Sequence, residues 1–457
     1  MLTYAEAVAA LEAAERFGIH PSLDGIRALA DAMGRPQDAF GSVQVTGTNG
    51  KSSTTRMTAA LLEAHGVRSG AYTSPELESM TERVEVAGAP VSEDDFAAAV
   101  EAAQHAEAAA RAAGRLAADA AITQFELLTA AALWLFCARS VDVACLEVGM
   151  GGRWDATSVV DPAVAVITGV GLDHVAHLGT TRETIAEDKS QIIKAASTAV
   201  LGPGTVGVES VLLRRAEQLG THPRAVRPFE RATPVLEDLT VRYEVLEHPS
   251  APGGETVLRV RGIHADYAGL TLRAPVYQAA NAATSIAAAE AGLGHSLEPD
   301  AVRSALGGMT FPGRFELVRV TPPLVIDGAH NPQAAAVLAD AICDAWPDPS
   351  QRPTLLLGIL ADKDAAGIVE ALGPTVGRIA ATRSASGRAL EPDALAEIIS
   401  KVRGGRPEVF PDVASALDVL GGASSGAHAS MPGLVVSGSI TTAGEARRWA
   451  RERGLGT

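Results

Sequence analysis

Apolar runs of strand length alternate with helix-length segments along almost the whole chain. Residues 43–46 read as a strand, and residues 141–148 and 163–168 are mostly apolar rather than alternating, which is typical of strands that are covered on both faces. Residues 54–65 have a helical pattern that ends at Gly66. This rhythm predicts a parallel sheet with helices packed on its faces, the α/β class of fold.

The rhythm is interrupted once and then resumes, which predicts two domains. Between residues 224 and 272, short β-like pieces are broken by Pro and Gly and indicate a small antiparallel β excursion of the first domain. We expect an N-terminal α/β domain over residues 1–295, a linker over 296–312, and a C-terminal Rossmann-like α/β domain over 313–457. Within the second domain, helices are predicted at 332–345 and 365–372.

Composition narrows the function classes. The chain has 457 residues, of which 47% are hydrophobic and 20% are charged, as in an ordinary folded globular protein. Its net charge of −16 argues against nucleic acid as the main partner. Three cysteines, expected to be buried thiols, are too few for a disulfide framework or a thiolate metal site. The N-terminus does not resemble a signal peptide and no apolar run is long enough to span a membrane, so we expect a cytoplasmic protein without a membrane partner.

A glycine-rich loop follows the strand at 43–46 and opens the next helix. Its sequence is Thr-Gly-Thr-Asn-Gly-Lys-Ser-Ser-Thr over residues 46–54. Glycines let backbone N–H groups turn inward, the helix N-terminus adds a positive potential, and Lys51 neutralises phosphate charge. The loop is one of P-loop type, although it is shorter than the common G-x-x-x-x-G-K-[ST] pattern.

Further polar residues follow the strands of both domains. Glu147 ends the second apolar strand, where a carboxylate can bind Mg²⁺ beside phosphates, and His174 follows the third. In the second domain, Asp327 and His330 follow the first strand, and Arg314 stands at the domain junction. Arginine can bind phosphates and aspartate can bind ribose hydroxyls, but a local hydrogen bond explains each of these residues equally well.

In their order along the chain, these segments resemble those of one family: the folylpolyglutamate synthases, including the bifunctional dihydrofolate synthases, which are related to the muramyl-peptide ligases. The matching segments cover most of the chain: 46–54, 72–75 with 82–84, 125–129, 147–157, 172–174 with 178–179, 189–194, 277–282, 312–314, 327–332, 360–364 and 437–439.

The resemblance implies an ATP-dependent amide ligase. The substrate carboxylate would attack the γ-phosphate of ATP to give an acyl phosphate, and the amine of L-glutamate would then displace phosphate. The carboxylate substrate would be a folate or dihydropteroate, Mg²⁺ would be the metal, and we expect a monomer.

The resemblance also implies roles for individual residues. The catalytic residues would be Lys51, Lys189, Arg314 and His330, with Lys189 carbamylated although a helical lysine is normally a solvated charge. The residues expected to bind ATP are Thr48, Asn49, Gly50, Lys51, Ser52, Ser53, Asn281, Arg314 and Asp327. The Mg²⁺ ligands would be Ser74, Glu147 and His174. Glutamate would be positioned by Arg83, His330 and Ser439, and the pterin side would be lined by Phe125 and Asp155.

The chain departs from the family pattern at three places. Glu76 stands where the family commonly has His, Ser52 replaces a Gly, and Ser190-Gln191 replaces Ala-Gly. Three alternatives stay open at this point. They are a muramyl-type ligase with a different carboxylate acceptor, a nucleotide-binding regulatory NTPase, and a binding protein without catalytic activity.

Overall fold

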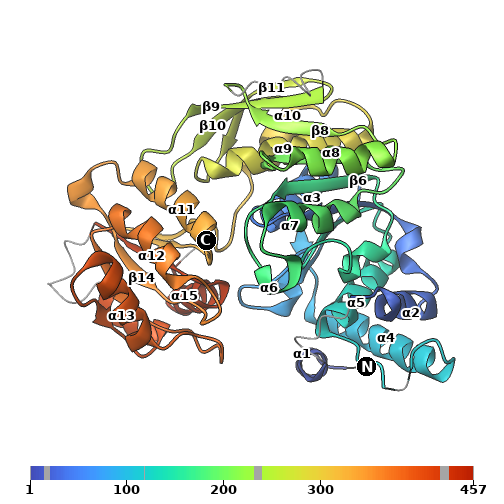
Figure 1. Cartoon of the computed structure of the whole chain (residues 1–457), viewed down its shortest axis with the longest axis horizontal. Helices are drawn as coiled ribbons and strands as arrows, with labels where there is room; N and C mark the ends of the chain where they lie inside the picture. The colour runs from blue at the N-terminus through green and yellow to red at the C-terminus, as the bar shows by residue number, and fades with distance from the viewer. Residues whose placement is uncertain (1, 15–20, 118, 231–238, 422–431, 456–457) are drawn as a thin grey trace. The chain divides into compact units, whose positions relative to one another are not determined.

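The chain folds into two compact units (Figure 1). The computed structural model describes residues 2–14, 21–117, 119–230, 239–421 and 432–455. The first unit comprises 1–244, 259–270 and 280–306, and the second comprises 245–258, 271–279 and 307–457. The predicted first domain, residues 1–295, includes 245–258 and 271–279, whereas their contacts group these two segments with the second unit.

A large sheet runs through the first unit. Its strand order is β11-β10-β9-β8-β7-β6-β1-β5-β2-β3-β4. β1 lies between β5 and β6 and is parallel to both, so the carboxyl ends of these three strands share one edge. The strand bounds are β1 Gly41–Thr46, β2 Ser69–Tyr72, β3 Val84–Val86, β4 Ala89–Pro90, β5 Val143–Glu147, β6 Val164–Gly169, β7 Thr198–Gly204, β8 Arg224–Pro228, β9 Thr240–Glu247, β10 Thr256–Arg261 and β11 Asp266–Leu272.

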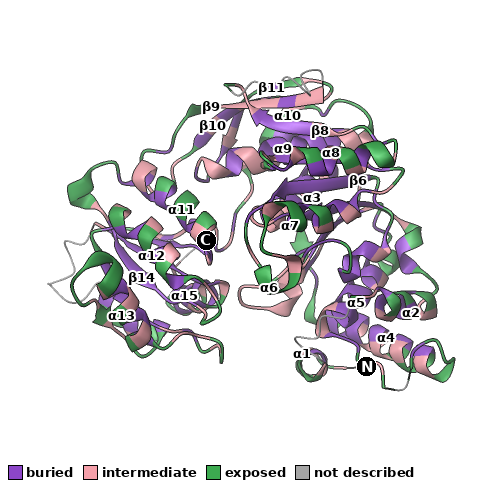
Figure 2. Ribbon diagram, viewed as in Figure 1, coloured by how far each residue is buried: buried purple, intermediate pink, exposed green. Residues whose placement is uncertain are grey.

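The central strands are buried (Figure 2), and for β5 and β6 this is what their continuous apolar patterns predict. One core cluster joins β5 to α1, α2, α4 and α5, and another joins β6 and β7 to α7 and α8. The helix bounds are α1 Tyr4–Ala13, α2 Asp24–Ala32, α3 Lys51–Glu63, α4 Glu93–Ala112, α5 Gln124–Ala138, α6 Val175–Leu178, α7 Arg182–Lys189, α8 Glu209–Gln218, α9 Tyr277–Leu293 and α10 Pro299–Gly307, with short 3₁₀ turns η1 Pro36–Ala39, η2 Met80–Arg83, η3 Ala156–Val159 and η4 Ser190–Ile192.

The predicted antiparallel character of residues 224–272 is wrong for its first pair of strands. β8 pairs with β9 in parallel, with Ala225 opposite Thr240. Antiparallel strands can be joined by a tight hairpin, whereas parallel strands need a longer connection, and residues 229–239 separate these two strands in the sequence. The strands of this region extend the large sheet at one edge.

The second unit has its own sheet, in the order β12-β13-β17-β14-β15-β16. Strands β13, β17, β14, β15 and β16 are mutually parallel, as the α/β rhythm predicts. The predicted helices at 332–345 and 365–372 are confirmed residue for residue. The bounds are β12 Glu316–Val320, β13 Pro323–Ile326, β14 Thr354–Leu357, β15 Arg378–Ala381, β16 Glu408–Val409, β17 Leu434–Ser437, α11 Pro332–Ala345, α12 Ala365–Leu372, α13 Pro392–Arg403, α14 Val413–Leu420 and α15 Ile440–Glu452, with η6 Pro349–Gln351 and η7 Gly373–Thr375.

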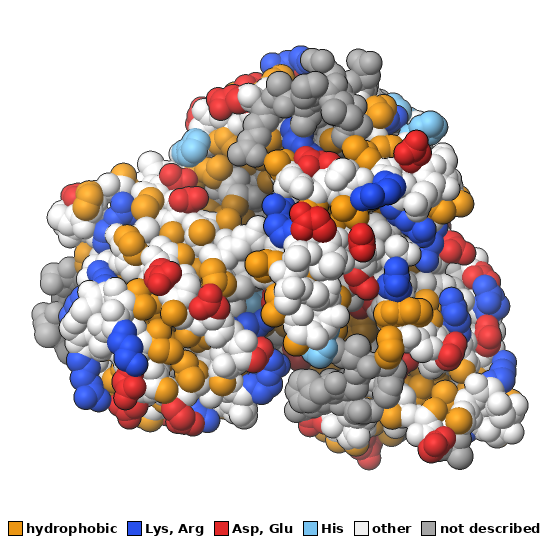
Figure 3. Space-filling view, in the orientation of Figure 1, with side chains coloured by type: hydrophobic (Ala, Val, Ile, Leu, Met, Phe, Trp, Pro, Cys, Tyr) orange, Lys and Arg blue, Asp and Glu red, His pale blue; other side chains and the backbone are white. Residues whose placement is uncertain are grey.

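Surface features agree with the composition. None of the helices in the described residues combines the length and the apolar character needed to cross a bilayer. On the face drawn in Figure 3, basic and acidic side chains are interspersed.

The expectation of three buried thiols is wrong in part: Cys145 is buried in β5, but Cys137 is exposed and Cys343 is half-buried.

Candidate functional site

The glycine-rich loop joins β1 to α3 and packs against α9. Gly50 has a φ of +83°, in the left-handed region that glycine adopts without steric cost. A Cβ at this position would lie 2.5 Å from Asn281 Oδ1. The structure therefore brings Asn281, predicted to bind the nucleotide, directly against the loop. Ser52 and Ser53 lie in the first turn of α3, where backbone N–H groups are not used within the helix.

The end of β6 holds the loop in place. The hydroxyl of Thr168 donates to the carbonyl of Asn49 over 2.7 Å. The N–H of Gly171 donates to the hydroxyl of Thr48 over 2.8 Å, and the N–H of Thr48 donates to the carbonyl of Gly169 over 3.0 Å. Sequence reasoning missed Thr168, although its place at the end of an apolar strand was a usable signal. These bonds fix the backbone that would face phosphates.

Two lysines converge on the carbonyl side of the loop. Lys51 Nζ donates to the carbonyl of Thr48 over 3.4 Å, and Lys189 Nζ donates to that of Gly47 over 3.2 Å. Lys189 is only 4% exposed, so the expectation of a solvated helical lysine is wrong. Burial, followed by the positive charge of Lys51, lowers the pKa of Lys189 to about 7. A large share of this amine is therefore neutral near physiological pH.

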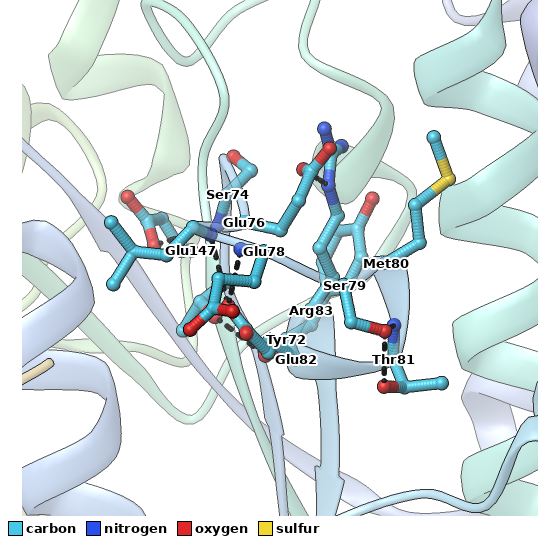
Figure 4. Close-up of polar contacts among 12 residues, drawn as sticks. Tyr72, Ser74, Glu76, Glu78, Ser79, Met80, Thr81, Glu82, Arg83 and Glu147 are labelled. Carbon is cyan, nitrogen blue, oxygen red and sulfur yellow. Dashed lines mark hydrogen bonds and ion pairs between the residues drawn. The ribbon is translucent and has the colours of Figure 1, made fainter. Parts of the chain in front are cut away.

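Two of the three predicted Mg²⁺ ligands lie together. Glu147, at the end of β5, is 1% exposed, and its Oε2 accepts the N–H of Ser74 over 3.1 Å. Figure 4 shows the two residues beside each other at the ends of β2 and β5. His174 precedes α6 with a φ of +51° and is exposed. Among the described residues, no three His, Cys, Asp or Glu side chains form a metal-binding group, but the Ser74–Glu147 pair offers the hard oxygen donors that Mg²⁺ prefers.

The residues predicted to line the pterin side meet at the loop after β5, where a Cβ at Gly149 would lie 2.8 Å from Phe125 Cζ and 3.2 Å from Asp155 Oδ2. Phe125 lies at the start of α5, and its ring is 5.9 Å from that of Tyr72. Asp155 accepts the N–H groups of Met150 and Thr157, each over 3.0 Å, and burial raises its pKa. Its carboxylate therefore holds the loop after β5 in shape. Arg83 ends η2 and forms an ion pair with Glu76.

In the second unit, Asp327 organises the turn around Arg314. Its carboxylate accepts the N–H groups of Phe315 and Ala329, each over 2.8 Å, and the hydroxyl of Tyr277 over 3.4 Å. Burial raises the pKa of Asp327. Arg314 Nη1 donates to the carbonyl of Gly313 over 3.0 Å. The carboxylate of Asp327 therefore accepts hydrogen bonds from the backbone of its own turn. This is the local role that the sequence left open as an alternative to binding ribose.

His330 and Ser439 follow neighbouring parallel strands, β13 and β17. His330 Nδ1 lies 2.9 Å from the carbonyl of Gly328, so the other ring nitrogen is the one oriented for further contacts. Ser439 caps α15: its hydroxyl accepts the N–H of Thr442 over 3.0 Å. The structure thus places these two predicted residues at the carboxyl edge of the second sheet, where α/β proteins bind ligands.

Family models and solved structures agree on the relatives of this chain. Residues 45–202 match the model of the Mur ligase middle domain, and residues 313–437 match that of the Mur ligase, glutamate ligase domain. The dihydrofolate synthase/folylpolyglutamate synthase of Mycobacterium tuberculosis is 36% identical over 94% of this chain and 90% of its own length.

Two solved structures share the fold over nearly the full chain. M. tuberculosis folylpolyglutamate synthase complexed with ADP has a TM-score of 0.87 at 34% identity, covering 98% of both chains. Escherichia coli FolC in complex with DHPP and ADP has a TM-score of 0.83 at 30% identity, covering 99% of both chains.

Lys51→Ala tests the phosphate role of the glycine-rich loop, with ATP as the probe. Loss of a charged hydrogen-bond donor to phosphate should weaken ATP binding about ten- to a hundredfold, measured by titration calorimetry. Lys401→Ala, at an exposed lysine near the end of α13, is the control and should bind ATP as the unaltered protein does. Unchanged affinity in Lys51→Ala would refute the assignment of this loop.

Proposed function

Because the chain belongs to the folylpolyglutamate synthase/dihydrofolate synthase family, we propose that it is an ATP-dependent ligase that adds L-glutamate to reduced folates and to dihydropteroate. The observation that carries the proposal is the family match across both sheets, combined with a glycine-rich loop that two lysines contact. This combination favours a ligase over a regulatory NTPase. A regulatory NTPase would use the glycine-rich loop but would not need the residues of the second unit around Asp327 and His330.

The first chemical step activates a carboxylate that does not react with amines at neutral pH. A carboxylate oxygen of the acceptor attacks the γ-phosphorus of ATP, the bond to the β-phosphate oxygen breaks, and ADP leaves. Lys51 and the N–H groups at the start of α3 offset the charge that develops on the phosphate oxygens. The proposed nucleotide contacts are Asn281, which lies against Gly50, and Arg314, which stands in the turn that Asp327 organises.

Ser74 and Glu147 supply the donors for Mg²⁺, with His174 as the third proposed ligand. Their hydroxyl and carboxylate oxygens fit the preference of this ion, and the contact between Ser74 and Glu147 supports their common role. When bound, Mg²⁺ neutralises phosphate charge and orients the triphosphate.

The second step forms the amide bond. The glutamate amine attacks the acyl carbon, the tetrahedral intermediate expels phosphate, and the nitrogen loses a proton. Arg83, His330 and Ser439 are proposed to position glutamate, and Phe125 and the loop held by Asp155 to receive the pterin. We further propose a cytoplasmic monomer with no nucleic-acid partner, in keeping with the net charge of −16.

The proposed activity is tested by phosphate release from MgATP in the presence of L-glutamate, with mass spectrometry of the products. Dihydropteroate and tetrahydrofolate are offered separately, and both should gain the mass of one glutamyl residue. Addition to tetrahydrofolate alone would restrict the protein to polyglutamylation. ATP turnover that does not depend on glutamate would instead favour the regulatory NTPase, and ligation only to another carboxylate would favour the muramyl-type alternative.

Lys189 is proposed to carry a carbamate, formed when its neutral amine attacks CO₂ and releases a proton. With a pKa of about 7, the amine is increasingly protonated as the pH falls below 7, so activity should decline there and recover with added bicarbonate. The carbamate should give a carbon-13 NMR signal after labelling with carbon-13 bicarbonate.

Lys189→Ala should lose ligase activity, and acetate or propionate should restore part of it by supplying the missing carboxylate. Lys401→Ala serves as the matched control and should need no rescue. Full activity in CO₂-free buffer, together with no carbamate signal from Lys189, would contradict the modification.

A further inference from the structure

The loop between β2 and β3 is closed mainly by bonds to its backbone. The N–H of Thr73 donates to the carbonyl of Arg83 over 2.9 Å. Glu82 Oε2 accepts the N–H groups of Leu77 and Glu78 over 2.9 and 3.4 Å. Figure 4 shows Glu78 and Glu82 of this loop on the same side of the sheet end as Ser74. The shape of the loop therefore has support that does not involve the side chain of Arg83.

The contact between Glu76 and Arg83 is of a different kind, because it joins two charged side chains across the loop. Arg83 Nε donates to Glu76 Oε2, and Figure 4 shows the two groups pointing toward each other. The Arg83 side chain is 12% exposed and that of Glu76 is 24% exposed, so the pair is shielded but reachable from solvent. Guanidinium N–H groups bind carboxylates, and here the Nε–H of Arg83 is taken by a carboxylate of the chain itself.

The pair lies next to the proposed ligase chemistry. Arg83 directly precedes Val84, which pairs with Tyr72 between β3 and β2, and the ring of Tyr72 lies 5.9 Å from that of Phe125. The same loop begins at Ser74, whose N–H is bonded to Glu147. A substrate carboxylate that reaches Arg83 therefore meets a guanidinium that is already engaged.

We propose that Glu76 is a specificity-determining residue: its carboxylate competes with the carboxylate of the incoming amino acid for Arg83, and so sets the affinity for that substrate. The inference rests on the proposed function, in which Arg83 positions L-glutamate. Displacement of Glu76 leaves the backbone bonds of Thr73 and Glu82 in place, so the loop keeps its form while the guanidinium exchanges one carboxylate for another.

Glu76→Gln tests the competition, because it removes the charge and keeps the size of the side chain. The KM for L-glutamate should fall about two- to fivefold, the range that corresponds to loss of a partly exposed ion pair, with little change in kcat. Glu107→Gln is the matched control: Glu107 pairs with Arg111 in α4 over 2.6 Å at 27% and 29% exposure, away from the loop. It should leave the KM unchanged. A KM that stays constant in Glu76→Gln would overturn the proposal. A KM that rises would also overturn it and would show that Glu76 holds Arg83 in position for the substrate.

A double-mutant cycle separates competition at Arg83 from general charge repulsion. In an Arg83→Ala background, Glu76→Gln should no longer change the KM, whereas simple repulsion between Glu76 and the substrate would lower it in both backgrounds and contradict the proposal. Circular dichroism checks that the alanine variant folds, and Arg83→Gln replaces it if it does not.

Absence of glutamate-dependent turnover in the unaltered protein would be a failure of the proposed function, not of this inference. The thermal shift caused by L-glutamate then decides the inference. A larger shift in Glu76→Gln than in the unaltered protein supports competition, and equal shifts overturn it.

Discussion

The parallel pairing of β1 with β5 on one side and β6 on the other is the constraint on which the first-unit site depends. It brings three strand ends to one edge, so that the glycine-rich loop, Glu147 and Thr168 come together from distant parts of the chain. The loop is then fixed from the β6 side by Thr168 and approached by Lys51 and Lys189. Two cations this close oppose each other, and the buried one responds with a lowered pKa.

The acidic residues divide into two kinds that sequence alone does not separate. Asp155 and Asp327 are buried and accept backbone N–H groups of their own loops, which shapes the surfaces on which substrates would bind. Glu147 is also buried and also accepts a backbone N–H, but that of Ser74, which follows a different strand at the edge of the sheet. A carboxylate of the first kind organises a site, whereas one of the second kind is placed to take part in it.

Much of the fold could be predicted because hydrophobic patterning is a local signal. The continuous strands, the helix at 332–345 and the glycine-rich loop are all visible in short windows of sequence. The burial of Lys189 could not be predicted in this way, because it depends on the packing of α7 against a loop more than a hundred residues away along the chain. The parallel pairing of β8 with β9 and the contact of Glu76 with Arg83 were likewise hidden, since each depends on chain direction or side-chain geometry.

The most direct test of the central claim is the fate of oxygen-18 in the acceptor carboxylate. If this protein activates its acceptor as an acyl phosphate, each ligation leaves a single labelled oxygen in the released phosphate, detected by mass spectrometry or phosphorus-31 NMR. Product formation with unlabelled phosphate would contradict the account, because the acceptor carboxylate would then never have been bonded to phosphorus.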